Sequence, residues 1–410
     1  GNSADKPYVT GTPAAAPSAL SVAQTQVPSA GLQLLEIGGN QIPAVFQPWS
    51  VAPTGVISGP VQYGDGAGGN LNGCAPFAPG SLSGLVVLVD RGACNFTLKI
   101  KNVSDAGGSL GIIGLVAPGA PFSGGDGGDR PIDIPGYMID QANSNLLKSQ
   151  VGAALTLDPA NQLPLIGQMV GSSSRGPSNY YQQIKPEIGA PGASVSAIAG
   201  SGTGTGPFGG TSGAAPMVAG SAALLLDGFS TNQQGNGQGN ANGRALDPNA
   251  TKSLLMNNAE TDIDIDPFSG PAEITRIGGG EVRVDRAIAA PTAAWDDGAP
   301  QAALSFGMHE VDGTLSLTRT VRVRNFSNEQ HSYSVTPTFR FGNDAASGAV
   351  SVATVNRVDV RPGLGRDATF DVTLTIDGSK LPANAMNSGS NGADGAALSL
   401  NEYDGYLVLD

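Results

Sequence analysis

The sequence predicts an α/β protein that continues into an all-β region toward its C-terminus. A buried-strand pattern at 85–89 precedes a helical pattern at 96–106 and a second strand pattern at 111–116, which together form a strand–helix–strand unit. Apolar residues then alternate with polar ones at 315–323 and 370–376, as in half-buried strands. With 60 glycines and 29 prolines in 410 residues, the composition is typical of short strands and tight turns.

Four segments differ in composition and pattern, and we expect each to be a separate part of the fold. They are residues 1–36, 37–163, 164–296 and 297–410. The third contains an apolar run of small residues at 214–226, which predicts a central helix surrounded by protein on all sides. The chain ends within an apparent strand, so we expect the last segment to be truncated.

Local signals place further elements. A strand is expected around 19–27, and Gly107-Gly108 is expected to stop the helix at 96–106. Asp247 and Pro248 supply an N-cap and a first-turn proline for a helix at 249–257. The Gln, Asn and Gly residues of 230–243 predict a flexible loop between the two helices of this segment.

The charge balance excludes some classes of partner. Twenty-one basic and 34 acidic residues leave a net charge of −13, and no Lys/Arg cluster is present. Nucleic acids and anionic membrane surfaces are therefore not expected partners. No run approaches the roughly 20 apolar residues that a membrane-spanning helix needs, so no transmembrane segment is expected.

Cys74 and Cys94 are the only cysteines, and they are 20 residues apart. A disulfide between them would stabilise the fold by about 3 kcal/mol on the chain-entropy model and would be typical of an exported protein. Two reduced thiols are the alternative.

A serine at the start of a helix is the most informative feature. Ser212 follows Gly209-Gly210-Thr211 and precedes the small-residue helix. The free N–H groups and the dipole of a helix N-terminus favour negative charge that develops beside such a serine. The simpler alternative is an ordinary N-cap serine.

The stretch Gly210-Thr211-Ser212-Gly213-Ala214-Ala215-Pro216 resembles the G-T-S-x-A-x-P nucleophile motif of subtilisin-like serine proteases, the subtilases. Segments 173–177 and 185–192 resemble the family's sequence upstream of that serine, and 1–22 resembles its oxyanion-hole segment. The resemblance implies that Ser212 is the nucleophile and that the Asn2 side-chain amide stabilises the oxyanion, an interaction of roughly 2.7–4 kcal/mol. Gly213 stands where the family more often has Met.

Two further parts resemble domains that accompany subtilases. Residues 37–163, through the stretch 85–96 and the positions that follow it, resemble the protease-associated (PA) domain inserted in many large members. The resemblance implies an α/β insert that controls access of protein substrates. Residues from 297 resemble a fibronectin-III-like β-sandwich. The expected fold is thus a partial subtilisin-like parallel-sheet domain with an inserted α/β PA domain and a C-terminal all-β sandwich.

The base of a catalytic triad is not evident. His309 and His331 are the only histidines, both in the C-terminal β region, and neither lies in the family's H-G-T-H context. In the family the Asp and His precede the oxyanion segment, so we expect both upstream of Gly1. The chain is therefore interpreted as an N-terminally truncated fragment of a secreted or envelope-associated serine endopeptidase, inactive alone. The alternative is a non-catalytic extracellular protein that binds proteins or the envelope through its PA and β-sandwich domains.

The expected partners are protein or peptide substrates, and no cofactor is evident. Structural calcium occurs in the family, but no calcium site is assigned in this sequence. Asp262, Asp264 and Asp266 alternate with isoleucines, lack the spacing of an EF-hand loop, and are predicted to form a solvated strand or turn face.

Overall fold

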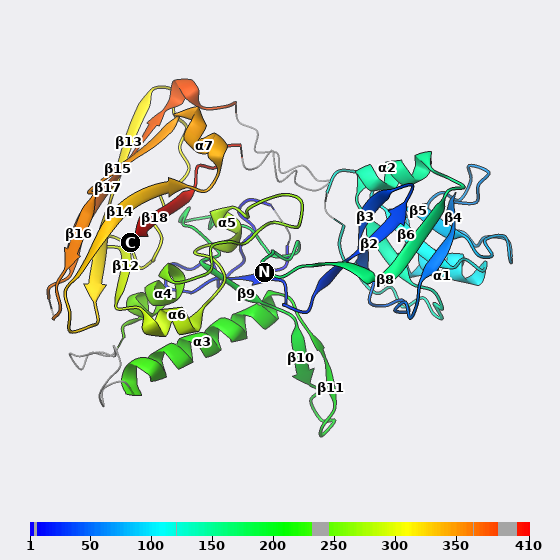
Figure 1. Cartoon of the computed structure of the whole chain (residues 1–410), viewed down its shortest axis with the longest axis horizontal. Coiled ribbons are helices and arrows are strands. Elements are labelled where there is room, and N and C mark those ends of the chain that lie inside the picture. Colours follow the sequence, from blue (N-terminus) through cyan, green and yellow to red (C-terminus); the bar gives the residue numbers. More distant parts are fainter. Residues whose placement is uncertain (4–5, 120, 232–245, 364, 384–399) are drawn as a thin grey trace. The chain divides into compact units, whose positions relative to one another are not determined.

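A computed structural model of the chain describes residues 1–3, 6–119, 121–231, 246–363, 365–383 and 400–410. These residues fall into two compact units (Figure 1). The barrel unit comprises residues 29–165, and the main unit comprises the described residues before and after it. Most of the expected flexible loop at 230–243 lies outside the described residues.

Seven strands of the barrel unit close in the order β2-β3-β7-β6-β5-β4-β8. The elements in chain order are β2 (Gly31–Ile37), β3 (Asn40–Phe46), β4 (Ile57–Tyr63), β5 (Val86–Asp90), α1 (Phe96–Asp105), β6 (Leu110–Gly114), β7 (Gly136–Ile139), α2 (Gln141–Ser149) and β8 (Ala154–Pro164). Strands β4 to β7 pair in parallel in the order β4-β5-β6-β7, and the other pairs are antiparallel. Because β2 pairs with β3 and β8, the barrel unit begins before residue 37. The sequence had predicted that it starts at residue 37.

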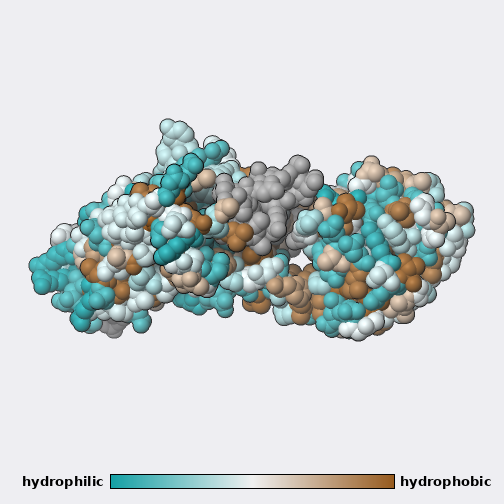
Figure 2. Space-filling view, turned by 90° about the horizontal axis from the view of Figure 1, so that it is seen from above, coloured by the Kyte–Doolittle hydropathy of each residue, from teal (hydrophilic) through white to brown (hydrophobic). Residues whose placement is uncertain are grey.

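The strand–helix–strand prediction for β5, α1 and β6 is confirmed. Successive side chains of β5 point to opposite faces, so Val86 and Leu88 lie in the barrel interior while Val87 and Val89 pack against α1. Gly111 lets α1 approach, since a Cβ there would lie 2.7 Å from Ile100 Cδ1. On the face shown in Figure 2, hydrophobic residues of the barrel unit are scattered among hydrophilic ones.

The first half of the main unit is built around one long helix. Strand β1 (Val22–Thr25) pairs in parallel with β9 (Ile188–Pro191), and α3 (Thr211–Thr231) packs on both. The further elements are the hairpin β10 (Ser194–Ala197) and β11 (Thr205–Phe208) and the helices α4 (Pro248–Asn257), α5 (Ile274–Ile277) and α6 (Val284–Ala289). As predicted, Asp247 caps α4: its side chain accepts a hydrogen bond from Ala250 N (2.8 Å).

The expectation that α3 is surrounded on all sides is wrong for the described structure. Ala214, Val218 and Leu225 are buried in the core, but Leu224 is 57% exposed and Met217 52%. The physical reason is that, in the described part of the chain, β1 and β9 form a sheet of only two strands, which covers one face of the helix.

The second half of the main unit contains two sheets. Their elements are β12 (Thr292–Asp296), β13 (Thr314–Asn325), β14 (His331–Phe339), α7 (Gly342–Ser347), β15 (Val350–Thr354), β16 (Arg357–Val360), β17 (Ala368–Asp377), the 3-10 helix Gly378–Lys380 and β18 (Gly405–Leu409). One sheet has the order β12-β13-β17-β15 and the other β16-β14-β18. Val323 and Phe370 of the first share a core with Val335 and Val360 of the second. Because β12 belongs to the first sheet, this sheet begins before residue 297. The sequence had predicted that the β region starts at residue 297.

Within the described part of the chain, no helix combines the length and apolar character needed to cross a bilayer.

Candidate active site

Ser212 is the second residue of α3 and is exposed. The helix begins on the carbonyl oxygen of Gly210, which accepts hydrogen bonds from Gly213 N (2.9 Å) and Ala214 N (3.3 Å). No hydrogen bond joins Ser212 Oγ to another described residue. The hydroxyl is therefore presented to solvent at the positive end of the helix dipole.

Asn2 lies beside this helix start. Its side-chain oxygen Oδ1 accepts hydrogen bonds from both the backbone N and Oγ1 of Thr211, each at 3.0 Å. Because Thr211 engages the oxygen of the carboxamide, the Nδ2 group is the end left to donate. Of the two site residues predicted from sequence, Asn2 thus contacts Thr211, and Ser212 is the residue that follows Thr211 in the chain.

Glycines allow the backbones around Ser212 to approach closely. A Cβ at Gly213 would lie 2.1 Å from the carbonyl oxygen of Gly192, in the segment that follows β9. A Cβ at Gly210, which has φ of 83°, would lie 2.8 Å from Asn2 Nδ2. The glycine at 213, where the family more often has Met, is therefore explained by its contact with the backbone at Gly192.

Pro216 lies inside α3, in its second turn. Proline has no N–H, so it cannot donate the i to i−4 hydrogen bond to the carbonyl oxygen of Ser212. The helical ladder of α3 therefore lacks the hydrogen bond to the carbonyl oxygen of Ser212.

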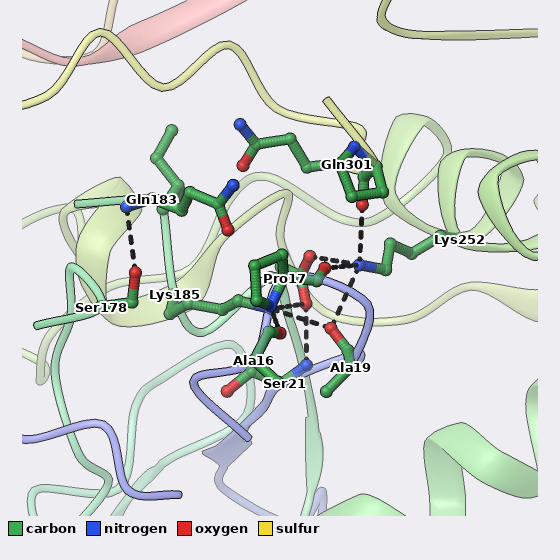
Figure 3. A network of polar contacts seen from close by, with 12 residues as sticks. Ala16, Pro17, Ala19, Ser21, Ser178, Gln183, Lys185, Lys252 and Gln301 are labelled. Atoms are coloured by element: carbon green, nitrogen blue, oxygen red, sulfur yellow. Dashed lines mark hydrogen bonds and ion pairs between the residues drawn. The ribbon is translucent and has the colours of Figure 1, made fainter. Parts of the chain in front are cut away.

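A buried charge network fixes the segment between Asn2 and β1 (Figure 3). The Glu187 carboxylate accepts hydrogen bonds from Lys185 Nζ (2.7 Å), Lys252 Nζ (2.7 Å) and Ser21 N (2.8 Å). The two ammonium groups also donate to backbone carbonyl oxygens of Ala16, Pro17, Ala19 and Pro300. Burial, more than any other cause, lowers the pKa of Lys185. Because all three charged residues are at most 5% exposed, each depends on the others for compensation.

The two histidines have their contacts away from Ser212. His309 Nε2 is 2.6 Å from Phe306 O, and His331 Nε2 is 2.8 Å from Ser327 Oγ. The described chain therefore brings the predicted nucleophile and the predicted oxyanion donor together, but it places neither histidine as the base.

The other residues singled out in the sequence lie as follows. Asp266 accepts hydrogen bonds from Phe268 N (2.8 Å) and Ser269 Oγ (2.6 Å) within a turn, and Asp262 N bonds to Glu260. Among the described residues, no group of three or more potential ligands is arranged to hold a metal ion. In the barrel unit, Cys74 and Cys94 are joined by a disulfide with a Cα–Cα distance of 5.8 Å.

The buried charges around the site were not predicted from the sequence. The available signal was the presence of charged residues inside the two family-like segments that precede Ser212, namely Arg175, Lys185 and Glu187. Lys252 and Glu402 had no such signal, because each is brought to its partner only by the folded chain.

With this geometry in place, comparison with known proteins identifies the family. The model of the subtilase family matches residues 1–302, so the chain belongs to the subtilase family. A subtilisin-like protease, Apa1, from the Antarctic psychrotroph Pseudoalteromonas sp. AS-11 is similar at 18% identity and a TM-score of 0.30, over 70% of this chain and 62% of that one.

Two other proteins share shorter stretches. A zinc aminopeptidase from Bacillus subtilis is 21% identical over 34% of this chain and 33% of its own, with a TM-score of 0.27. The E3 ubiquitin-protein ligase RNF13 of Gallus gallus is 33% identical over 106 residues, which are 23% of this chain and 28% of that protein. The chain thus spans about a third or less of these two relatives.

Proposed function

We propose that this chain is the nucleophile-bearing part of a serine endopeptidase that hydrolyses peptide bonds through an acyl-enzyme. The observation that carries the proposal is the bonding of Asn2 to Thr211, which leaves an amide donor near Ser212, the second residue of α3. Membership of the subtilase family supports the same reaction and suggests protein or peptide substrates.

In the proposed mechanism, Ser212 Oγ attacks the scissile carbonyl carbon while a histidine takes its proton. The carbonyl oxygen becomes negatively charged and receives hydrogen bonds from Asn2 Nδ2 and the Ser212 N–H. The amine then leaves with the proton that the histidine returns. Water, deprotonated by the same histidine, attacks the acyl ester and releases the free acid and Ser212.

The histidine and its carboxylate partner come, in this proposal, from residues outside the printed sequence. The support is that His309 and His331 bond to Phe306 and Ser327. We therefore expect the 410-residue chain alone to hydrolyse casein no faster than its Ser212→Ala variant.

The accessory parts are proposed to be a PA domain and a fibronectin-III-like sandwich. Support for the first is a barrel unit with parallel strands β4 to β7, in which Asp90, the last residue of β5, accepts from Tyr63 OH (2.5 Å) and pairs with Lys148 Nζ (2.8 Å). Support for the second is the core shared by the sheets around β13 and β14. We propose that the barrel unit controls access of protein substrates.

The protein is proposed to act outside the cell or at the cell envelope. The disulfide between Cys74 and Cys94 supports this location, because such bonds persist in oxidising compartments.

The test uses the full-length protein that contains this chain. Ser212→Ala should abolish casein hydrolysis and covalent labelling by a phosphonylating serine reagent, while Ser221→Ala, in the same helix, should preserve both. Undiminished hydrolysis by the Ser212→Ala protein would refute the proposed mechanism.

A non-catalytic protein-binding role is the second candidate, and the contacts of the two histidines favour it. That function predicts that the full-length protein is neither labelled at Ser212 nor active on casein. Labelling of Ser212 with loss of casein hydrolysis in Ser212→Ala would exclude it.

A further inference from the structure

Arg175 lies directly behind the segment that carries Asn2. The preceding residue, Ser174, donates its backbone N–H to Gly1 O (2.9 Å) and accepts from Ser3 N at Oγ (2.9 Å). Ser174 therefore holds the residues on both sides of Asn2. Arg175 follows it immediately and is 0% exposed, so its charge must be compensated inside the protein.

The contacts of the Arg175 guanidinium include three described residues. Its Nε donates to Thr275 Oγ1 (3.1 Å), one terminal nitrogen lies 3.5 Å from Glu273 Oε1, and the other donates to Glu402 Oε2. Thr275 Oγ1 in turn donates to Glu402 Oε1 (2.8 Å). Glu402 thus binds both Arg175 and the Thr275 hydroxyl that accepts a hydrogen bond from Arg175.

Glu402 comes from the C-terminal segment just before β18, and further contacts hold that segment in place. Asp404 Oδ2 accepts a hydrogen bond from Ile274 N (2.6 Å), next to Thr275. Arg340, at the end of β14, donates to three backbone carbonyls of the loop before α5, those of Thr261, Ile263 and Ala272. The C-terminal sheet is therefore fastened to the loop that ends at Glu273 and to the start of α5, which contains Thr275.

We propose that Glu402 is a positioning residue for Asn2. Glu402 holds Arg175 in place, and Arg175 in turn holds Ser174, which binds both neighbours of Asn2. The Asn2 amide is thereby held where it would donate a hydrogen bond to the oxyanion. The inference rests on the proposed function for its catalytic consequence. The structural connection between Glu402 and Asn2 stands on the contacts alone. It gives the C-terminal region a direct part in the geometry of the active site.

The physical reason is the burial of Arg175. Removing Glu402 takes away one of the carboxylates that compensate the buried guanidinium, and a less well compensated charge favours movement of the side chain toward water. If Arg175 moves, the backbone at Ser174 moves with it, and the two hydrogen bonds to Gly1 and Ser3 lengthen. Displacement of a catalytic donor by about 1 Å is enough to cost about 100-fold in rate.

The first experiment measures hydrogen–deuterium exchange in the 410-residue chain. Glu402→Ala should raise exchange at residues 1–9 and 172–178, with Glu402→Gln intermediate. The control is Asp359→Asn, which removes an exposed carboxylate of the same region that binds Arg357 and Ser332. It should leave both segments unchanged. Unchanged exchange at 1–9 in a folded Glu402→Ala or Glu402→Gln protein would overturn the proposal.

The second experiment measures peptide hydrolysis by the full-length protein. Glu402→Ala should lower kcat by about 10- to 100-fold with little change in KM, and Glu402→Gln should recover part of that loss. If Glu402 acts through Asn2, adding Glu402→Ala to Asn2→Ala should lower kcat much less than it does in the wild type. An equal fold-loss in both backgrounds would contradict the positioning role.

The two experiments separate the failure of the inference from that of the proposed function. If Ser212→Ala retains activity, the proposed mechanism fails, while the exchange measurement still decides whether Glu402 orders the Asn2 segment.

Discussion

The side-chain oxygen of Asn2 accepts two hydrogen bonds from Thr211, one from its backbone N and one from Oγ1. Thr211 is the residue immediately before Ser212. This pair joins the beginning of the chain to the start of α3 and orients the Asn2 carboxamide, whose Nδ2 group is its donor.

Thr211→Val should lower activity without unfolding the protein. Valine keeps the backbone donor and the shape but removes the hydroxyl, so Asn2 loses one of its two restraints. A neutral hydrogen bond is worth about 1 kcal/mol, which corresponds to about a five-fold lower kcat in the full-length protein. Thr211→Ser, which keeps the hydroxyl, is the control. Equal kcat values for the valine and serine variants would show that the hydroxyl does not orient Asn2.

Gly213→Ala should destabilise the main unit. The new Cβ would lie 2.1 Å from Gly192 O, a contact that requires the backbone to shift, at a cost of about 1–3 kcal/mol. Gly220 lies in the same helix with nothing within 4 Å of its Cβ position. Gly220→Ala should therefore stabilise the helix by about 0.5–1 kcal/mol. Urea unfolding of both variants, followed in the 410-residue chain, tests the opposite signs, and a stabilising Gly213→Ala would contradict the close approach.

Glu187→Ala should be strongly destabilising, by about 3–5 kcal/mol, because it leaves Lys185 and Lys252 buried without their shared carboxylate. Asp377→Asn, which removes the charge that pairs with Lys380 but keeps the side-chain oxygen that accepts from Ser379 N, should have no measurable effect. Thermal unfolding of the two variants beside the wild type gives the comparison. A Glu187→Ala protein as stable as the wild type would mean that the network in Figure 3 does not contribute to stability.

How far the fold could be predicted depends on how local each signal was. Helix α1 and its flanking strands were predictable, because their apolar spacing is set by their own residues. The junction of β2 with β8 closes the barrel across more than 100 residues, so the start of this unit was placed at 37 and not before β2.

The candidate site divides in the same way. Ser212 and Asn2 were predictable because each lies in a short motif that resembles one family. The contact between Arg175 and Glu402 joins residues 227 positions apart, and neither residue has a neighbour in sequence that indicates its partner. The exposed side of α3 could not be predicted either, because an apolar sequence pattern contains no information on how many strands will cover the helix.

The stability of the main unit should fall as the pH rises from about 4 to 7. Burial is the main cause that raises the pKa of Glu402 to about 7 and the pKa values of Asp344 and Asp404 to about 6. The charged and titratable groups that face these carboxyls are Arg175, Arg340, Glu273 and Tyr8. A carboxyl with a higher pKa in the folded state binds its proton more tightly there, so its contribution is full at low pH and is lost as pH rises through the folded pKa.

The measurement is the Tm of the 410-residue chain between pH 4 and 8, for the wild type and for Asp344→Asn. The asparagine variant removes one of the three titrations and should show a shallower fall. A wild-type Tm that rises more steeply than that of the variant between pH 5 and 7 would contradict the direction of these shifts.

The most direct test of the account is the kcat of Asn2→Ala in the full-length protein, measured on a peptide substrate. If Asn2 and Ser212 form one catalytic centre, loss of the amide removes a donor that acts only in the transition state. The kcat should then fall by about 100- to 1,000-fold, with KM within about two-fold of the wild-type value. An unchanged kcat in the Asn2→Ala protein would contradict the assignment of this pair as the active site.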